Sequence, residues 1–299
     1  MKRSFEPLSE RLITRFIQAA GYLSILFVAL IFLFLLREGL PALASVDFST
    51  LFGSRWYPIE DLYGIAPLFW GSILVTVSAS MIAMPLGILT AVYISEIAPL
   101  WLRTPLKSLV ELLAGIPSVV LGFTGILILS PVLRESLHLP TGLNALTGAI
   151  LLGYAAVPTI VSISEDALNA VPQSYREASL GMGATPWQTI WMVTLPAAKS
   201  GVITAVMLGI GRVIGETMAV MMVTGNAPVM PSGLASFVSP IRTMTATIAS
   251  EMGEVATGST HYQVLFFIGI VLFALSLVIN VVAYSLSSRT VKRTERLLS

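Results

Sequence analysis

Residues 201–225 read GVITAVMLGIGRVIGETMAVMMVTG, an apolar run with one arginine and one glutamate inside it. The run is long enough to cross a bilayer as a helix, which needs about 20 apolar residues. A charged side chain at the centre of such a helix costs about 2.5–3.5 kcal/mol on insertion scales, so charges there usually have a function. Arg212 and Glu216 are therefore the first candidate functional residues.

The composition of the whole chain also indicates a membrane protein. Of 299 residues, 55% are apolar and 11% are charged, whereas a soluble domain carries about 25% charged residues. The net charge is +1 without a basic stripe, so we expect no nucleic-acid partner. The chain has no cysteine, and we predict surface loop positions for its two histidines, His138 and His261. We therefore expect no metal site.

Six apolar windows are long enough to span a membrane, which predicts an all-α, polytopic protein with six transmembrane helices. The windows are 19–36, 71–95, 106–132, 143–163, 201–224 and 264–286. The first one follows basic residues and resembles a signal peptide, but its run of about 18 apolar residues exceeds the usual 7–15. We expect an uncleaved anchor. The predicted organisation is a tail (1–18), an anchor with its outer loop (19–64), a main domain (65–288) and a second tail (289–299).

Lysine and arginine counts predict the orientation, because cytoplasmic loops carry an excess of both. Both tails are basic, and an even number of spans places them on the same side. Twelve of these side chains fall on the predicted cytoplasmic side and four on the other. The twelve are Lys2, Arg3, Arg11, Arg15, Arg103, Lys107, Arg176, Lys199, Arg289, Lys292, Arg293 and Arg296, and the four are Arg37, Arg55, Arg134 and Arg242.

The predicted cytoplasmic link 164–200 is long and contains EASLGMGATPWQTIWMVTLP, residues 177–196. Pro172 suits the opening of one short helix, and Thr185 is a good cap for a second one that begins at Pro186. Gly183 loosens the backbone between them, and Pro196 is expected to end the second helix. The pattern predicts a helix–turn–helix outside the membrane.

This link also carries a family resemblance. Its spacing, Glu-Ala-Ser, three residues, Gly, nine residues, Val, one residue and Leu-Pro, resembles the coupling motif in membrane subunits of ABC importers. The family pattern has Ala for Ser179 and Ile for Val193, which are mild departures. The resemblance implies that this loop docks on an ATP-binding subunit. The implied coupling residues are Glu177, Ala178, Gly183, Leu195 and Pro196.

Two further segments narrow the resemblance to phosphate permeases of the PstC type. They are LLAGIPSVVLGFTG, residues 112–125, and GRVIGETMAVMMVTGN, residues 211–226. The resemblance covers roughly residues 65–286 and implies the type I ABC importer permease fold in the cytoplasmic membrane. The companion permease of the same importer has similar segments and stays an alternative. So does a permease for another oxyanion, such as sulfate or molybdate.

The resemblance implies that the chain is a transporter subunit without enzymatic activity or a cofactor of its own. ATP and magnesium would bind a separate subunit, which agrees with the absence of a phosphate-binding loop motif in this sequence. The implied partners are a second permease, two ATP-binding subunits, an extracytoplasmic phosphate-binding protein and membrane lipid. A membrane receptor and a passive channel are the rivals from other classes.

A helical projection of 201–224 places small residues on the face of Arg212 and bulky ones opposite, so we expect the Arg212 face to meet the bundle or a pathway. The small residues are Gly201, Ala205, Gly209, Gly215 and Ala219. Arg212 and Glu216 are four residues apart and can form a structural ion pair. Alternatively Arg212 binds the passing phosphate and Glu216 moderates its charge. In the third span, Pro117 predicts a break, beside which Ser118 either lines the pathway or packs at a kink.

Overall fold

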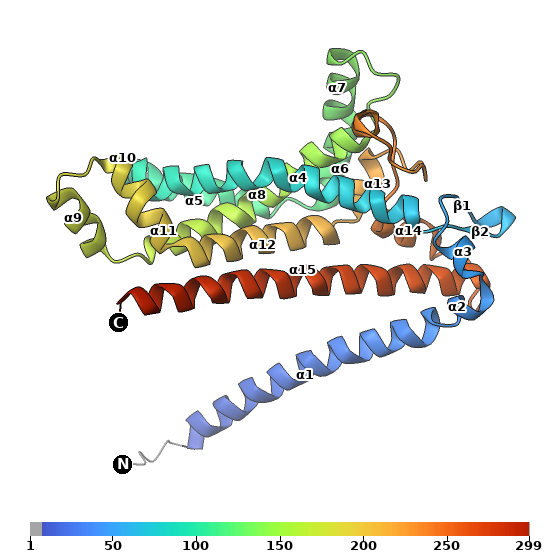
Figure 1. Cartoon of the computed structure of the whole chain (residues 1–299), viewed down its shortest axis with the longest axis horizontal. Coiled ribbons are helices and arrows are strands. Elements are labelled where there is room, and N and C mark those ends of the chain that lie inside the picture. Colours follow the sequence, from blue (N-terminus) through green and yellow to red (C-terminus); the bar gives the residue numbers. More distant parts are fainter. Residues whose placement is uncertain (1–7, 299) are drawn as a thin grey trace.

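The computed structural model describes the backbone of residues 8–298 and the side-chain surroundings of residues 12–282 and Ser285. Figure 1 shows long helices running side by side between two ends of the molecule. Within the described residues, five helical stretches are long and apolar enough to cross a membrane: Leu12–Ser45, Ala66–Ile97, Ser118–Ser136, Ala145–Asn169 and Thr260–Val282. The bent pair Pro186–Ala197 and Lys199–Gly215 adds a sixth if it counts as one span. The longest individual helices are α1 (Leu8–Gly39), α4 (Ala66–Val92), α8 (Ala145–Asn169), α12 (Lys199–Gly215) and α15 (Thr260–Leu298).

The predicted break in the third span, 106–132, is confirmed. The chain forms α5 (Leu100–Ala114), breaks, and continues as α6 (Ser118–Thr124), the π-helical η3 (Gly125–Leu129) and α7 (Ser130–Ser136). Pro117 is the cause, because a proline disfavours the helical conformation of the preceding residue. Its own ψ of 138° also lies outside the helical range.

The fifth predicted span, 201–224, is also broken. Helix α12 ends at Gly215, and the short helix α13 (Met218–Val223) follows. Glu216 adopts an extended ψ of 125° between them. Its carboxylate oxygen Oε1 accepts the backbone N–H groups of Thr217 at 3.2 Å and Ala219 at 3.3 Å. The glutamate thus satisfies amides at the start of α13 that a continuous helix would pair internally.

Helices α4, α8 and α12 pack around a common apolar cluster in the middle of the bundle. Ile160 of α8 sits between two glycines: a Cβ on Gly87 of α4 would lie 2.6 Å from Ile160 Cγ2, and one on Gly209 of α12 would lie 2.5 Å from Ile160 Cγ1. A side chain at either glycine would push the helices apart. The structure therefore confirms that the small-residue face of α12 meets the bundle.

One end of the molecule holds the short helices of the predicted helix–turn–helix: α9 (Gln173–Gly181), α10 (Pro186–Thr189), the π-helical η4 (Ile190–Thr194) and α11 (Leu195–Ala197). Figure 1 shows the start of α1 and the end of α15 at this same end. Both helices extend beyond the predicted spans 19–36 and 264–286. Lys2 and Arg3 lie outside the described residues, as do the side chains of Arg11 and of the basic C-terminal residues Arg289, Lys292, Arg293 and Arg296.

The opposite end is built from small elements between the spans. They are α2 (Ala42–Ser45), α3 (Phe48–Leu51), η1 (Pro58–Glu60), η5 (Leu234–Val238), α14 (Met244–Glu251) and a hairpin of β1 (Trp56–Tyr57) and β2 (Leu62–Tyr63). Trp56 pairs with Tyr63 in the antiparallel hairpin. A second apolar cluster packs these elements against the start of α15.

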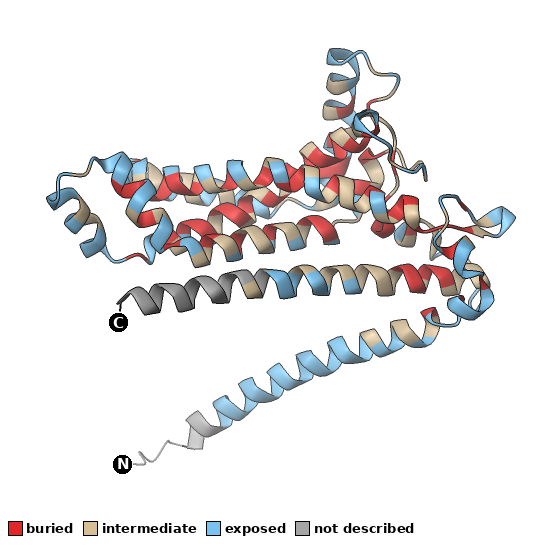
Figure 2. Ribbon diagram, viewed as in Figure 1, coloured by how far each residue is buried: buried red, intermediate tan, exposed pale blue. Residues whose placement is uncertain are grey.

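Helix α1 stands apart from the central bundle and leaves most of its apolar side chains exposed, as the pale colour in Figure 2 shows. Its contact with α15 includes stacked rings of Phe32 and Phe273, whose centroids are 4.7 Å apart. An apolar helix surface of this extent suits hydrocarbon surroundings. The arrangement agrees with a first span that contacts lipid over most of its length.

Candidate functional site

Arg212 lies in the last turn of α12 and is half-buried against α8. Its Nη1 donates a hydrogen bond to Thr159 Oγ1 at 3.3 Å. Gly209, one turn earlier, brings the two helices close enough for this contact. Within the described region, no ion pair involves Arg212. A guanidinium has five N–H donors, so most of them stay available to an anion.

The alternative of an ion pair between Arg212 and Glu216 is wrong. The i,i+4 spacing brings two side chains together only when the helix continues through both residues, and α12 ends at Gly215. The Glu216 carboxylate turns instead to the amides of Thr217 and Ala219. The backbone oxygen of Glu216 accepts a hydrogen bond from Thr245 Oγ1 at 3.3 Å, which links the break to α14.

Ser118 is the first residue of α6 and is half-buried, directly after the break that Pro117 causes. Helix α6 crosses α13 closely, because a Cβ on Gly122 would lie 3.1 Å from Ala219 Cα. Side chains next to both breaks, including Ile116 and Val213, pack in the same apolar cluster. The structure thus brings the two breaks into one region. Among the hydrogen bonds of the described residues, none joins Ser118 to Arg212 or Glu216.

A groove of about 290 Å³ lies beside Arg212, between α5 and α8. Its polar side chains are Glu111, Thr159 and Ser162, and Thr159 is also the partner of Arg212. Sequence reasoning missed the two hydroxyl residues because each is ordinary in an apolar helix. Their i,i+3 spacing, which puts them on one face of α8, is the signal that could have found them.

The predicted helix–turn–helix is confirmed at the end formed by α9 to α11. Thr185 Oγ1 accepts the Gln188 N–H at 3.3 Å, and Gln188 Oε1 accepts the Thr185 N–H at 2.8 Å, a reciprocal cap at the start of α10. Gly183 has a φ of +89°, a conformation that L side chains rarely adopt.

The expectation that the second helix ends at Pro196 is confirmed to within one residue. The helix continues through η4 and α11 to Ala197. A proline ring clashes with the carbonyl four residues earlier in an α-helix, and the wider π-turn of η4 immediately before α11 relieves that clash. The chain then bends by 72° between the segment Pro186–Ala197 and α12.

A largely apolar groove of about 670 Å³ separates α9 from α10 and η4. Ala178 and Gly183 line it, and Glu177 is exposed on α9 next to them. Leu195 and Pro196 lie in α11, where this unit joins the spans. Two methionines of the groove are strongly exposed, Met182 at 90% and Met192 at 73%. Apolar patches of this kind are typical of protein-binding surfaces.

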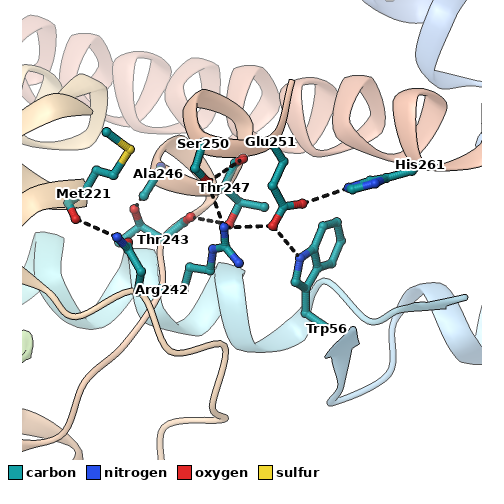
Figure 3. Close-up of polar contacts among 10 residues, drawn as sticks. Trp56, Met221, Arg242, Thr243, Ala246, Thr247, Ser250, Glu251 and His261 are labelled. Carbon is teal, nitrogen blue, oxygen red and sulfur yellow. Dashed lines mark hydrogen bonds and ion pairs between the residues drawn. The ribbon is translucent and has the colours of Figure 1, made fainter. Parts of the chain in front are cut away.

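A polar cluster at the opposite end was missed by sequence reasoning. Figure 3 shows Arg242, Trp56 and His261 converging on the carboxylate of Glu251. Arg242 Nη2 pairs with Oε1 at 2.8 Å, Trp56 Nε1 donates to Oε1 at 3.2 Å, and His261 Nε2 pairs with Oε2 at 2.8 Å. The predicted loop position of His261 is wrong, since it lies in the first turn of α15 with 21% of its side chain exposed.

This cluster ties the β1–β2 hairpin to α14 and α15. Close by, burial and the hydrogen bond from Tyr63 to Asp61, at 3.1 Å, raise the pKa of the Tyr63 phenol to about 12. The members lie up to about two hundred positions apart in the chain, so no local sequence pattern connects them. We interpret the cluster as structural, because it holds the hairpin against α14 and α15.

Comparison with known proteins gives consistent matches over most of the chain. Residues 83–293 match the family described as binding-protein-dependent transport system inner membrane component. A probable ABC transporter permease protein of Bacillus subtilis, YqgH, is 42% identical over 79% of this chain and 76% of its own length. The phosphate transport system permease protein PstC of Mesorhizobium japonicum is 32% identical over 93% of this chain and 89% of its own length.

Solved structures share the fold. A permease chain of the MetNI methionine ABC transporter is 21% identical, with a TM-score of 0.60 over 79% of this chain and 99% of that one. A chain of a bacterial ABC transporter that imports the acidic polysaccharide alginate is 16% identical, with a TM-score of 0.61 over 95% and 99%. The predicted type I ABC importer permease fold is therefore confirmed.

Proposed function

Because this chain belongs to the family of binding-protein-dependent transport system inner membrane components, we propose that it is the membrane-spanning permease subunit of an ATP-driven phosphate importer. Phosphate is proposed as the substrate because several relatives are named as phosphate transport permeases and match over most of both chains. The exposed Glu177–Pro196 unit is the part that suits a motor subunit. The chain is not itself an enzyme, and ATP hydrolysis lies in separate subunits.

Co-purification with the neighbouring gene products, followed by ATP-dependent phosphate uptake into proteoliposomes, tests this function. Competition by sulfate or molybdate stronger than by phosphate would instead identify a permease for another oxyanion. Uptake that continues without ATP would indicate a passive channel. A chain that binds no nucleotide-hydrolysing subunit would contradict the importer assignment.

We propose that Arg212 lies in the phosphate pathway. Its guanidinium is half-buried, has a neutral hydroxyl as its recorded partner, and that partner, Thr159, lines a groove that also holds Glu111 and Ser162. A planar guanidinium binds tetrahedral oxyanions through paired hydrogen bonds. Ser118, at the start of α6, and Glu216, between α12 and α13, are proposed to line the same route at the two helix breaks. Glu216 acts there by holding the start of α13 rather than by neutralising Arg212.

Thr159→Val is expected to slow phosphate uptake by about fivefold, well short of abolishing it. Valine matches threonine in shape but removes the acceptor that holds Arg212, a hydrogen bond worth about 1 kcal/mol. Initial uptake rates in proteoliposomes measure the effect. Thr204→Val, on the outer face of α12, is the matched control. Equal uptake by Thr159→Val and the parent protein would show that Arg212 needs no support from α8.

The partners we propose are a second, similar permease, two ATP-binding subunits and an extracytoplasmic phosphate-binding protein, in addition to membrane lipid. Permeases of this family function together with other ABC transporter subunits, which supports the proposal that this chain does so too. ATP and magnesium would bind the ATP-binding subunits, and this chain would hold no cofactor. Closure of those subunits would displace α9, α10 and α11 and so change the tilt of the spans.

The protein is a multi-pass membrane permease, and we propose that the end formed by α9–α11 and both termini faces the cytoplasm. Since the chain has no native cysteine, single cysteines can report the orientation. In intact cells, a membrane-impermeant thiol reagent is expected to label Thr257→Cys and to spare Ser174→Cys. The opposite labelling pattern would invert the topology.

A further inference from the structure

Helix α9 is attached to the rest of the protein in an unusual way. None of its apolar side chains is buried, so apolar packing contributes little to its position. Two polar side chains are the exceptions to its general exposure. Ser179 Oγ lies 2.9 Å from Thr189 Oγ1, which holds α9 to α10 within the same loop. Among the hydrogen bonds of the described residues, only those of Arg176 join a side chain of α9 to the spans.

Arg176 forms four hydrogen bonds that converge from two spans. Its Nε and Nη2 bind the two oxygens of Glu96 at 3.1 and 2.7 Å, a bidentate pair. Its Nη1 and Nη2 donate to the backbone oxygens of Val171 at 2.7 Å and Leu168 at 2.9 Å, at the end of α8. Both charged side chains are largely buried, with exposed fractions of 15% for Arg176 and 8% for Glu96.

Glu96 is rigidly connected to α4. It lies in the π-helical η2 (Tyr93–Ile97), which continues α4 without a change of backbone conformation. The preceding residue, Ser95, donates to Asn169 Oδ1 of α8 at 2.8 Å. Asn169 in turn donates to Glu165, which pairs with Lys107 of α5. A buried ion pair held by such neighbours has a single geometry and resists separation.

The segment from α9 to α11, which we call the coupling unit, has three connections to the spans. Two are covalent: residues 170–172 join α8 to α9, and α11 runs into α12 through the 72° bend. The third is the Arg176–Glu96 pair, which leads to α4, and α4 packs against α8 and α12 in the central cluster. A bend can absorb displacement, whereas a bidentate pair between a helix and the rigid end of a span transmits it.

We propose that Arg176 is a positioning residue that makes α9 and α4 move as one body when the coupling unit is displaced. This inference rests on the proposed function, since it presumes that an ATP-binding subunit pushes on α9. Arg176 touches neither nucleotide nor substrate in this scheme. It determines what fraction of ATP hydrolysis is converted into phosphate movement.

The first test measures phosphate uptake and ATP hydrolysis together in the reconstituted importer. Arg176→Ala and Glu96→Gln are each expected to lower the phosphate transported per ATP hydrolysed by about tenfold, because each breaks a desolvated charge pair. Arg176→Lys keeps the positive charge but loses the bidentate pairing of the guanidinium, and should restore part of the phosphate transported per ATP hydrolysed. The control is Arg103→Ala. Arg103 lines the same cavity as Glu96 and Arg176, but among the described residues its side chain donates only to the backbone oxygen of Ala98.

If phosphate uptake and ATP hydrolysis fall together, so that the phosphate transported per ATP hydrolysed is unchanged, the proposal is overturned. The Arg176–Glu96 pair would then have a structural role. An unchanged ratio with full activity would overturn it as well. A parent complex that neither hydrolyses ATP nor transports phosphate would instead defeat the proposed function, so the two failures can be told apart.

The second test does not depend on the stability of any Arg176 variant. Spin labels on Ser174→Cys in α9 and Leu89→Cys in α4, both exposed positions, report the distance between the two elements in the otherwise unchanged importer. The distance distribution is expected to be the same in the nucleotide-free and ATP-trapped complexes. A shift between these states would show that α9 moves independently of α4, which would refute the inference.

Discussion

Arg212→Ala is expected to abolish ATP-dependent phosphate uptake while the importer still assembles. The guanidinium has a neutral hydroxyl as its recorded protein partner, so its removal leaves no buried carboxylate without a counter-ion. The loss of stability should therefore be small, about 1 kcal/mol for one hydrogen bond. The loss of a bidentate contact to phosphate is larger, about 3 kcal/mol or more, which corresponds to at least about a hundredfold in rate.

Uptake of radiolabelled phosphate into proteoliposomes measures this effect, and co-purification of the other subunits confirms assembly. Arg212→Lys is the informative companion, because it keeps the positive charge but loses the planar pair of donors. We expect its uptake to lie between the parent and Arg212→Ala. Normal uptake by Arg212→Ala would remove Arg212 from the pathway.

The double substitution Met182→Glu and Met192→Glu is expected to prevent binding of the ATP-binding subunits. Both side chains line the groove beside α9 and are strongly exposed in the isolated chain. Burying a methionine side chain contributes about 1.5–3 kcal/mol, and burying an unpaired carboxylate in its place is strongly unfavourable. The combined change should weaken binding by more than about a hundredfold. Titration of the purified permease with the ATP-binding subunit measures it.

Leu234→Glu is the matched control for this experiment. Leu234 is 85% exposed and apolar like the two methionines, but it lies in η5 at the opposite end. Its substitution also replaces an exposed apolar side chain by a glutamate, with one added negative charge in place of two, and should leave the affinity for the ATP-binding subunit unchanged. If the double variant binds as tightly as Leu234→Glu does, the groove is not the docking surface.

The existence of the spans and of the coupling unit could be predicted because both depend on local pattern. Apolar runs reveal spans, and the cap at Thr185 is formed by residues only three positions apart. The break at Pro117 was visible for the same reason. The break at Glu216 was not visible, because the helical spacing of small residues continues through it. The hydrogen bonds that stabilise this break join Glu216 to Ala219 of α13 and to Thr245 of α14, and they form only when those helices are in place.

The polar contacts between distant segments were also beyond local reasoning. Nothing near Thr159 in the sequence points to Arg212, which lies 53 positions later. The partners of Glu251 come from the hairpin, from the segment before α14 and from α15, and meet only after the chain has folded. Pro196 shows the reverse case, in which a local rule suffices, because the helix ends one residue after the proline.

The interruption at Glu216 has a mechanical consequence for a protein that must open first on one side and then on the other. A continuous helix tilts as a rod, so an inward movement at one tip forces an outward movement at the far tip. Here the backbone hydrogen bonds stop at mid-span, with α12 fastened to α8 and α13 close to α6 and α14. The two halves of this span can consequently tilt separately, so a displacement of one tip need not move the other.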